Sequence, residues 1–548
     1  MQTALKDLPN DIKTLKKMVL NQINLRQEEA ETRNALAAQT QQHLDAKKQL
    51  EKENQNYKIQ VLSLQEQLNI LLHKRFGASS EKLSKDQLKL FNEAEQETDA
   101  LEQTALEDTK DNITVPEHQR KKPGRKPLPK SLPREEIIYD LTDDEKFCPD
   151  DGHALKAIGE ERTEQLDYIP AQVKVIEHVR LKYACPCCAQ GVKIAPLPPQ
   201  PLPKSIASPN LLAHVTVSKY ADGLPLYRQE KQWQRLGIEL GRGTLSNWMV
   251  GVGILVQPLI NLLREALLAN GYIQMDETPL QVLNEPGKTP QSQSYMWVQR
   301  GGPPGQTIVL FEYDPTRSGS VPVRLLDGFE GYLQTDGYEG YGAVCRQDGI
   351  TQLGCMAHAR RKFDEAIKAQ GKKKLNSNGN KATKGLNFIG KLYAIERAIK
   401  DSTLEERYQA RQEQTKPIIE EMKNWLETSL EQVPPQSAIG KAIYYTHRQW
   451  PKLIRYLDDG QLHIDNNLIE NAIRPFALGR KNWLFSNTQN GAKASAHLYS
   501  LVETAKDNGL EPYHYLRHVY RELPKAQTLE DIEALLPANI VKEKIIIS

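Results

Sequence analysis

Three acidic residues in the second half of the chain could bind divalent cations. Asp276 and Asp336 each end a strand-like run of β-branched and aromatic residues, where side chains of neighbouring strands can converge. Aspartate also ends strands because of its turn chemistry, so neither residue alone indicates a site. Together with a third carboxylate they could hold two Mg²⁺ or Mn²⁺ ions roughly 3.5–4 Å apart, an arrangement that promotes in-line displacement at phosphorus.

Glu470 is the candidate for the third carboxylate. It stands in HIDNNLIENAIRPFALGRKNWLFSN, residues 463–487, just before a basic and aromatic run. Asn467 precedes it by three residues, which is the spacing of a capping box, so a helix cap is the alternative. Arg474 falls on the same helical face, while Pro475 disfavours continuation of the helix. Phosphate contacts and a stacking surface would come from the residues that follow, Arg480, Lys481 and Trp483.

The elements that must position the aspartates follow a mixed pattern. Strand-like runs occur in GYIQMDETPLQVL, SYMWVQRGG, QTIVLFEYDP and GYLQTDGYEGYGAV, bounded by Gly, Pro and Asp. Between the last two of these runs, TRSGSVPVRLLDGF can hold one helix. Three strands, a helix and a further strand predict a mixed α/β sheet of ribonuclease-H-like order.

The N-terminal region has a different periodicity. Residues 15–75 are polar, rich in Gln, Glu, Lys and Leu, and free of Gly and Pro. A heptad seam runs through Leu50, Asn54, Tyr57, Val61, Leu64, Leu68 and Leu71. The pattern predicts a helix that ends at Gly77 and a coiled coil that makes a homodimer or higher oligomer. A helical hairpin within one chain is the alternative, because it has the same periodicity.

Composition and charge restrict the class of protein. Of 548 residues, 39% are hydrophobic and 26% charged, as in ordinary globular proteins. Apolar runs are too short for a membrane span and the N-terminus lacks a signal-peptide core, so we expect a cytoplasmic protein with no membrane partner. The net charge of +2 conceals an acidic block at 91–111 and a basic block at 119–134.

The basic block is a candidate DNA contact. Its segment QRKKPGRKPLPK contains too much Pro and Gly for a helix. The PGRKP core is similar to extended hooks that lie in the A·T minor groove, and a generic phosphate-binding tether explains it equally well. The residues that would contact DNA are Arg120, Lys121, Lys122, Arg125 and Lys126.

The spacing of the cysteines indicates a small metal module. Cys185 and Cys188 have the separation of a zinc knuckle. Upstream, Cys148 is followed by Asp151 where a second cysteine would be expected, with His153 two residues further on. These residues could hold a structural Zn²⁺, and a β module without metal is the alternative. Alternating apolar residues in DYIPAQVKVIEHVRLKYAC predict the strands of a hairpin.

A helical region follows this module. Residues 196–203 contain five prolines and predict an extended spacer. Residues 208–255 then predict helices, with a break at Gly237 and a second helix capped near Thr244. This pattern is typical of a helix-turn-helix, and an ordinary helical hairpin is the alternative. The DNA-facing side chains would be Arg242, Thr244 and Asn247.

These motifs, taken in order, resemble a known family. The family is that of the bacterial transposases of insertion-sequence family sixty-six, DDE type. The segments that resemble it are KRFGASSEK, GRKPLPKSLPRE, the cysteine module, LPLYRQEKQWQRLGIELGRGTLSNW, MDETPLQVL, LQTDGYEGYGAV, CMAHARRKFDEA, DNNLIENAIRPFALGRKNWLFSN and YSLVETAKDNGLEPYHYLRHV. The resemblance covers nearly the whole chain. It implies that Asp276, Asp336 and Glu470 are the metal-binding triad.

The resemblance also implies a largely helical insertion between Asp336 and Glu470. Residues 360–455 agree with it, because they are rich in Lys, Glu and Gln and have helical patterning. Within AHARRKF, the DNA path could be lined by His358, Arg360, Arg361 and Lys362. Asp151 departs from the family's second cysteine, and this departure places zinc binding in doubt without affecting the triad.

We therefore predict a multidomain α+β chain. Its parts would be a coiled coil (1–80), an acidic then basic linker (81–135), a zinc-finger-like β module (136–195), a proline linker with helix-turn-helix-like helices (196–268), and a ribonuclease-H-like core (269–355 and 461–548) with a helical insertion (356–460). The expected function is that of a DNA transposase, which binds terminal inverted repeats, cleaves 3′ ends and joins them to target DNA. Small element-encoded accessory proteins are further expected partners. A non-catalytic DNA-binding repressor or architectural protein and a host nuclease are the alternatives.

Overall fold

The computed structural model describes residues 11–76, 172–184, 192–369 and 380–547. The chain divides into two compact units, one formed by residues 1–93 and 199–548 and the other by residues 94–198. Two predicted sites lie outside the described residues. They are the basic hook at Arg120, Lys121, Lys122, Arg125 and Lys126, and the zinc ligands Cys148, Asp151, His153, Cys185 and Cys188.

Helix α1 (Ile12–Phe76) confirms the long helix predicted for the N-terminal region. Its predicted seam is open to solvent: Leu50, Tyr57 and Leu64 are each 65% exposed, Val61 is 61% exposed and Leu68 is 55% exposed. So long a helix with an exposed apolar seam is expected to pack against a partner helix. The identity of that partner stays a prediction.

The second unit contains a short hairpin in its described part. Strand β1 (Lys182–Ala184) pairs antiparallel with β2 (Val192–Ile194). The predicted strand region was wrong over residues 172–181, which are not in a strand. Val175 and Val179 are 94% and 76% exposed, so the alternating apolar residues do not face a core there.

The larger unit is built around a mixed sheet. Its strands are β3 (Tyr272–Asn284), β4 (Gln293–Gly301), β5 (Ile308–Asp314), β6 (Gly331–Gln334), β7 (Ile350–Leu353) and β8 (Ser486–Thr488). The order is β5-β4-β3-β6-β7, and β8 pairs with the far end of β3. Strands β3, β4 and β5 are antiparallel, whereas β6 runs parallel to β3 and β7 parallel to β6. Helix α8 (Ser320–Leu325) lies between β5 and β6, so the predicted sequence of three strands, a helix and a strand is confirmed.

The helices before the sheet share its hydrophobic core. They are α4 (Pro209–Tyr220), α5 (Leu226–Arg235), α6 (Arg242–Leu255) and α7 (Gln257–Leu268). The predicted break at Gly237 is confirmed, with a positive φ of 74°. The second helix starts slightly earlier than the cap predicted near Thr244, because α6 begins at Arg242 and the carboxylate of Glu230 on α5 accepts from the Arg242 N–H at 3.0 Å.

Two of these core helices are apolar enough to raise the question of a membrane segment. Within the described ranges, no single helix is long and apolar enough to cross a membrane. Helices α6 and α7 meet that test only as a pair bent by 48°. In this fold they bury Val252, Leu259 and Leu263 in the core of the larger unit.

The C-terminal helices complete this core. They are α14 (Asn467–Trp483), α15 (Gln489–Asp507), α16 (Pro512–Glu522), α17 (Leu529–Glu533) and α18 (Lys542–Ile547). Helix α15 covers the outer edge of β5, where the Phe311 N–H donates to Ser500 Oγ at 2.8 Å and the Val309 N–H donates to Thr504 Oγ1 at 3.0 Å. These bonds occupy backbone groups of an edge strand that would otherwise be free to pair.

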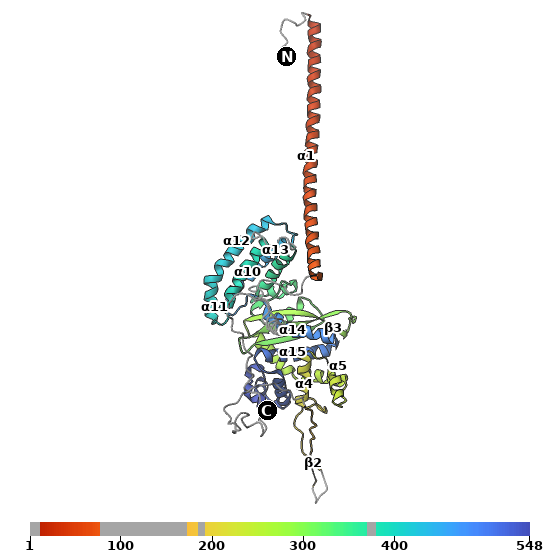
Figure 1. Cartoon of the computed structure of the whole chain (residues 1–548), viewed down its shortest axis with the longest axis vertical. Helices are drawn as coiled ribbons and strands as arrows, with labels where there is room; N and C mark the ends of the chain where they lie inside the picture. The colour runs from red at the N-terminus through yellow and green to blue at the C-terminus, as the bar shows by residue number, and fades with distance from the viewer. Residues whose placement is uncertain (1–10, 77–171, 185–191, 370–379, 548) are drawn as a thin grey trace, which may run out of the picture. The chain divides into compact units, whose positions relative to one another are not determined.

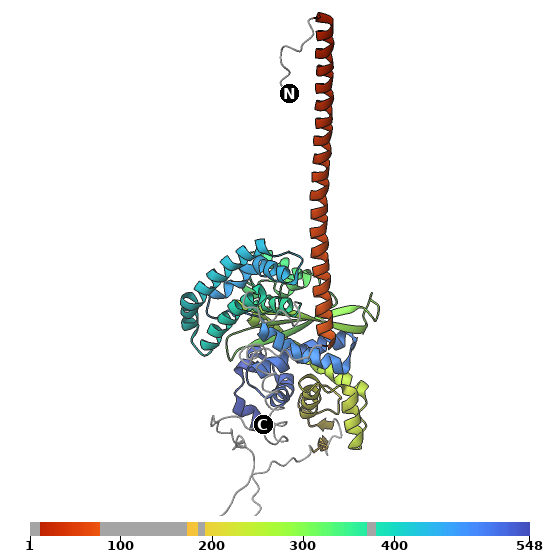
Figure 2. The ribbon, with the colours of Figure 1, turned by 45° about the horizontal axis from the view of Figure 1, so that its top comes forward.

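The segment between β7 and α14 is helical, as predicted, and has a core of its own. Its helices are α9 (Met356–Ala369), α10 (Lys381–Ala398), α11 (Leu404–Ala410), α12 (Lys416–Gln432) and α13 (Ala438–Leu453). Their buried apolar side chains form a second cluster, to which Tyr272, Leu353 and Ile464 contribute from the sheet and its flanks. Figures 1 and 2 show α10–α13 as one group, separated by the strands from α4 and α5.

One buried arginine ties this helical insertion to the segment that returns to the sheet. Arg411 is fully buried and forms a double hydrogen bond with the Glu396 carboxylate at 2.9 and 2.7 Å. Its remaining N–H groups donate to the carbonyls of Tyr456, Asp459 and Leu462 at 2.8–2.9 Å. All five donors of the guanidinium are therefore used.

We expect Arg411→Met to lower the free energy of unfolding by about 3–5 kcal/mol, because it leaves a charged glutamate and three carbonyls without their donor. Urea unfolding followed by circular dichroism measures the change. Arg397→Met, at an exposed arginine of α10, is the matched control and should change stability by less than about 0.5 kcal/mol. Equal effects of the two substitutions would contradict the assignment.

Candidate active site

Asp276 and Asp336 lie next to each other because their strands are parallel neighbours. The last paired residues of β3 and β6 are Gln274 and Gln334. Asp276 and Asp336 each follow this pair by two residues. Asp336 follows the end of β6, as predicted, but the prediction that Asp276 ends a strand is wrong, because β3 continues to Asn284. Since side chains alternate along a strand, the same register directs both carboxylates toward the same face.

Glu470 reaches this end of the sheet from the first turns of α14. The helix begins at Asn467, and the preceding N-cap residue, Asn466, makes no side-chain cap bond. The Asp465 carboxylate accepts from the Asn467 N–H instead, at 3.1 Å. The alternative of a capping box between Asn467 and Glu470 is therefore wrong, and Glu470 is not used to cap the helix.

Helix α14 also runs further than predicted. Pro475 does not end it, because the helix continues through to Trp483. The buried side chains of Ile473 and Phe476 on either side of the proline pack into the core. This packing outweighs the loss of one helical hydrogen bond at the proline.

The three carboxylates share one electrostatic environment. The pKa of Asp276 is raised to about 8, chiefly by burial. The neighbouring charges of Glu277, Asp336 and Glu470 add to that rise. Burial also raises the pKa of Glu470, and the charge of Asp336 acts in the same direction. Mutual repulsion of this kind requires that the groups face one region of space.

Helix α9 brings basic side chains to Glu470. His358 Nδ1 lies 4.0 Å from one carboxylate oxygen, and an Arg361 guanidinium nitrogen lies 3.9 Å from the other. Burial, followed by the charge of Arg361, lowers the pKa of His358, so its imidazole is neutral at neutral pH. Arg361 and Lys362 are exposed, whereas Arg360 is only 3% exposed. The prediction that Arg360 lines the DNA path is therefore not met.

A fourth acid, Glu277, lies beside the triad and was missed by the sequence patterns. Its buried carboxylate accepts from Arg317 Nε at 2.7 Å and from the Tyr341 hydroxyl. Arg317 also stacks over the Tyr338 ring, with 3.7 Å between the guanidinium carbon and the ring centroid. Only the adjacency of Glu277 to Asp276 could have suggested its involvement. No local pattern indicates Arg317, which is 40 residues away from Glu277.

The donor chemistry of the site suits hard divalent cations. Carboxylate oxygens are the ligands that Mg²⁺ and Mn²⁺ prefer, and burying several like charges without a counter-ion is unfavourable. Across the described ranges, no group of three or more His, Cys, Asp or Glu side chains is arranged to hold an ion by itself. A bound ion would therefore need further oxygen ligands, such as those of a substrate phosphate.

The predicted DNA contacts on α6 lie at the surface. Its first two turns expose three side chains named from the sequence, Arg242, Thr244 and Asn247. Leu245, Trp248 and Met249 on the opposite side are buried in the core. The helix therefore presents a polar N-terminal face while its apolar face holds it in place.

The residues that follow Glu470 differ in accessibility. Arg474 is partly exposed and Lys481 is exposed. Arg480 is turned toward β3, where it donates to Thr278 Oγ1 at 3.2 Å and to the Pro279 carbonyl. It thus fastens α14 to the strand that carries the first aspartate.

Trp483 is less available for stacking on a base than its sequence position suggested. Its ring is partly buried and packs edge-to-face on Phe476, with 5.5 Å between the centroids. The exposed apolar side chains here are its neighbours, Leu484 at 63% and Phe485 at 42%. The predicted DNA contact by Trp483 stays a prediction.

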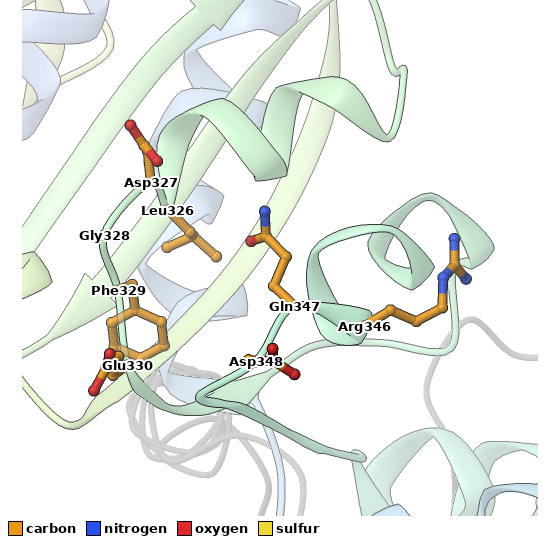
Figure 3. Close-up of a pocket in the computed structure, with 8 residues that line it drawn as sticks. All are labelled: Leu326, Asp327, Gly328, Phe329, Glu330, Arg346, Gln347 and Asp348. Atoms are coloured by element: carbon orange, nitrogen blue, oxygen red, sulfur yellow. The ribbon is translucent and has the colours of Figure 1, made fainter.

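A separate surface pocket lies at the opposite end of β6 and β7 from the acids. Its lining comes from the turns before the two strands, with Leu326, Phe329 and Glu330 on one side and Gln347 and Asp348 on the other (Figure 3). Its cavity volume is about 410 Å³. Because Asp336 follows the carboxyl end of β6, this pocket is not part of the carboxylate site.

Comparison with known families places these features in context. The model of the transposase IS66 family matches residues 204–494. The zinc-finger binding domain of transposase IS66 matches residues 145–189, and the IS66 C-terminal element matches residues 500–538. A further family model, described as transposase C of IS166 homeodomain, matches residues 63–137.

Individual relatives extend over the same regions. Uncharacterized protein y4jD of Sinorhizobium fredii is 34% identical over 426 residues, which cover 75% of this chain and 81% of that protein. Uncharacterized protein y4qI of the same organism is 30% identical over 553 residues, which cover 98% of this chain and 99% of that protein. Both are thus similar to this chain over most of their length.

The matched models define the class of protein as a DNA-binding transposase with a zinc-finger domain and a DDE-family catalytic domain. More particularly, the chain belongs to the transposase IS66 family, since that family's model covers more than half of its length. The resemblance in the sequence motifs is thereby confirmed.

The raised pKa of Asp276 predicts a pH-dependent effect of its removal. Because its folded pKa of about 8 exceeds the ordinary value of 3.8, folding takes up a proton between these values and the metal-free protein loses stability as pH rises toward 8. We expect Asp276→Asn to raise the free energy of unfolding by about 1 kcal/mol or more at pH 8, with a smaller gain at pH 5. Thermal melts in EDTA measure both.

The exposed Asp348 provides the control for this measurement. Asp348→Asn should show no gain that grows between pH 5 and pH 8. If Asp276→Asn changed the melting temperature equally at both pH values, the buried and repelled state of this carboxylate would be ruled out.

Proposed function

We propose that this transposase binds the terminal inverted repeats of its element, cleaves the 3′ ends and joins them to target DNA. The observation that supports the proposal is the register of β3 and β6, which places Asp276 beside Asp336, together with the effect of the charges of Asp336 and Glu470 on the pKa of Asp276. The strand order, with three antiparallel strands followed by two parallel ones, supports a ribonuclease-H-like core.

Each residue has a role in this proposal. Asp276, Asp336 and Glu470 would hold two Mg²⁺ or Mn²⁺ ions, which when bound activate the attacking oxygen and stabilise the leaving oxygen. Arg361 and the neutral His358 lie beside Glu470 and would contact the DNA backbone. Water would first attack the phosphodiester at the element end, and the released 3′-hydroxyl would then attack target DNA.

The remaining regions would position the DNA. The zinc-finger-like module, the basic hook and the exposed N-terminal face of α6 offer contacts to the inverted repeats. The exposed seam of α1 supports pairing of two protomers, which would hold two element ends together. Phosphate contacts dominate the affinity of such proteins and would make binding strongly dependent on salt.

The catalytic role of Glu470 is tested by Glu470→Gln, which keeps the shape of the side chain and removes its charge. With Mg²⁺ and a labelled duplex from the element end, we expect the variant to bind as the wild type does and to cleave at least about 100-fold more slowly. Band shifts measure binding and denaturing gels measure cleavage.

The matched control is Glu420→Gln at an exposed glutamate of α12, which should cleave normally. If wild type and both variants bind the duplex and none cleaves with accessory proteins supplied, a DNA-binding repressor becomes the better description. If the wild type cleaves all duplexes without preference for the element end, the chain is a nuclease.

The pairing role of α1 predicts a change in mass. Leu50→Glu together with Leu64→Glu places charges in the exposed seam, and we expect the full-length chain to change from a dimer or larger assembly to a monomer. Light scattering after size exclusion measures the mass. Asn56→Glu, at an exposed position off the seam, should leave it unchanged. A wild-type chain that is already monomeric would refute the coiled coil.

A further inference from the structure

The segments that contain the two aspartates have nearly the same sequence. Residues 271–276, GYIQMD, include the start of β3, and residues 331–336, GYLQTD, comprise β6 and the two residues after it. In both, a glutamine precedes the aspartate by two residues and shares its face of the sheet. Parallel pairing in register then sets Gln274 directly beside Gln334.

These two glutamines are hydrogen-bonded to each other and fully enclosed. Gln274 is 1% exposed and Gln334 is 0% exposed. Gln274 Nε2 donates to Gln334 Oε1 at 2.7 Å. The Tyr272 hydroxyl donates to the same oxygen and accepts from Gln274 Nε2 at 2.9 Å. The pair thus forms a small polar layer two residues before each aspartate.

The same two amides also hold the chain that leads to the third acid. Gln334 Nε2 donates to the His463 carbonyl at 2.8 Å and to the Gly354 carbonyl at 3.0 Å. Gln274 Nε2 lies 3.1 Å from the Asp465 carbonyl. Residues 463–465 lead into α14, which carries Glu470. Gly354 lies two residues before the start of α9, which carries His358.

We propose that Gln274 and Gln334 are positioning residues that fix the distance between the aspartate strands and the glutamate helix. This inference rests on the proposed transposase function. The return segment follows a helical insertion of roughly a hundred residues, so its placement needs bonds to the sheet. Buried amides with fixed partners hold such a segment more rigidly than apolar contacts do, because each bond has a required direction.

Gln334→Met tests the proposal, since methionine keeps the volume and removes both donors. We expect amide hydrogen exchange over residues 463–470 to become faster in the full-length chain, and cleavage of the element-end duplex to fall about 10–100-fold with unchanged DNA affinity. Tyr272→Phe removes a single oxygen from the layer and should act in the same direction with a smaller effect.

Gln299 on β4 provides a matched control. It is 1% exposed in the same sheet, and within the described part of the chain its amide has no hydrogen-bond partner. Gln299→Met should change neither exchange over 463–470 nor cleavage. Mass spectrometry of deuterated peptides and single-turnover cleavage in Mn²⁺ give the two readouts.

The outcomes separate the positioning role from the proposed function. Faster exchange together with slower cleavage in Gln334→Met and Tyr272→Phe, but not in Gln299→Met, supports the positioning role. Unchanged exchange, or faster exchange with normal cleavage, overturns it. If the wild type itself does not cleave, the transposase mechanism fails, and with it the catalytic meaning of the glutamines, whatever the exchange data show.

Discussion

The parallel pairing of β3 with β6 is the contact on which the active-site arrangement depends. It sets Asp276, which lies inside β3, beside Asp336, which follows the end of β6. The antiparallel strands β4 and β5 widen the sheet on one side, and α15 covers the outer edge of β5 with Ser500 and Thr504. The rigid part of the fold thus carries two of the three carboxylates, and the third must be delivered by a distant segment.

The position of the third carboxylate, Glu470, depends on the helical insertion that precedes it in the chain. The chain leaves the sheet after β7, forms a helical unit with its own apolar cluster, and returns at residues 463–465. Arg411 anchors the path of this return by bonding to three carbonyls. Arg480 then fastens α14 to β3 through Thr278 and the Pro279 carbonyl. The position of Glu470 therefore depends on hydrogen bonds made both before and after it in the chain.

Concentrating negative charge in a partly buried region has an energetic cost that the structure offsets only in part. Arg317 neutralises Glu277, and Arg361 lies near Glu470, but the pKa of Asp276 stays raised. The unbalanced charge is consistent with a site that acquires cations and a substrate phosphate together. The free protein is therefore less stable than it would be without this charge, and binding of cations would offset the loss, as is common at functional sites.

The sequence by itself determined the family, the long N-terminal helix, strands β3 to β6 of the mixed sheet and the helical character of the insertion, because these depend on local periodicity and ordered motifs. It did not reveal β7 and β8, and it wrongly predicted strands over residues 172–181. Tertiary structure decided how α6 and α14 begin and where α14 ends. Glu230 supplies the cap of α6 from another helix, Asp465 displaces the expected capping box, and packing carries α14 past Pro475. It also decided which side chains surround the acids, since Arg317 reaches Glu277 only once the sheet has formed. Such partners are distant in sequence, and no local pattern can encode a contact that packing creates.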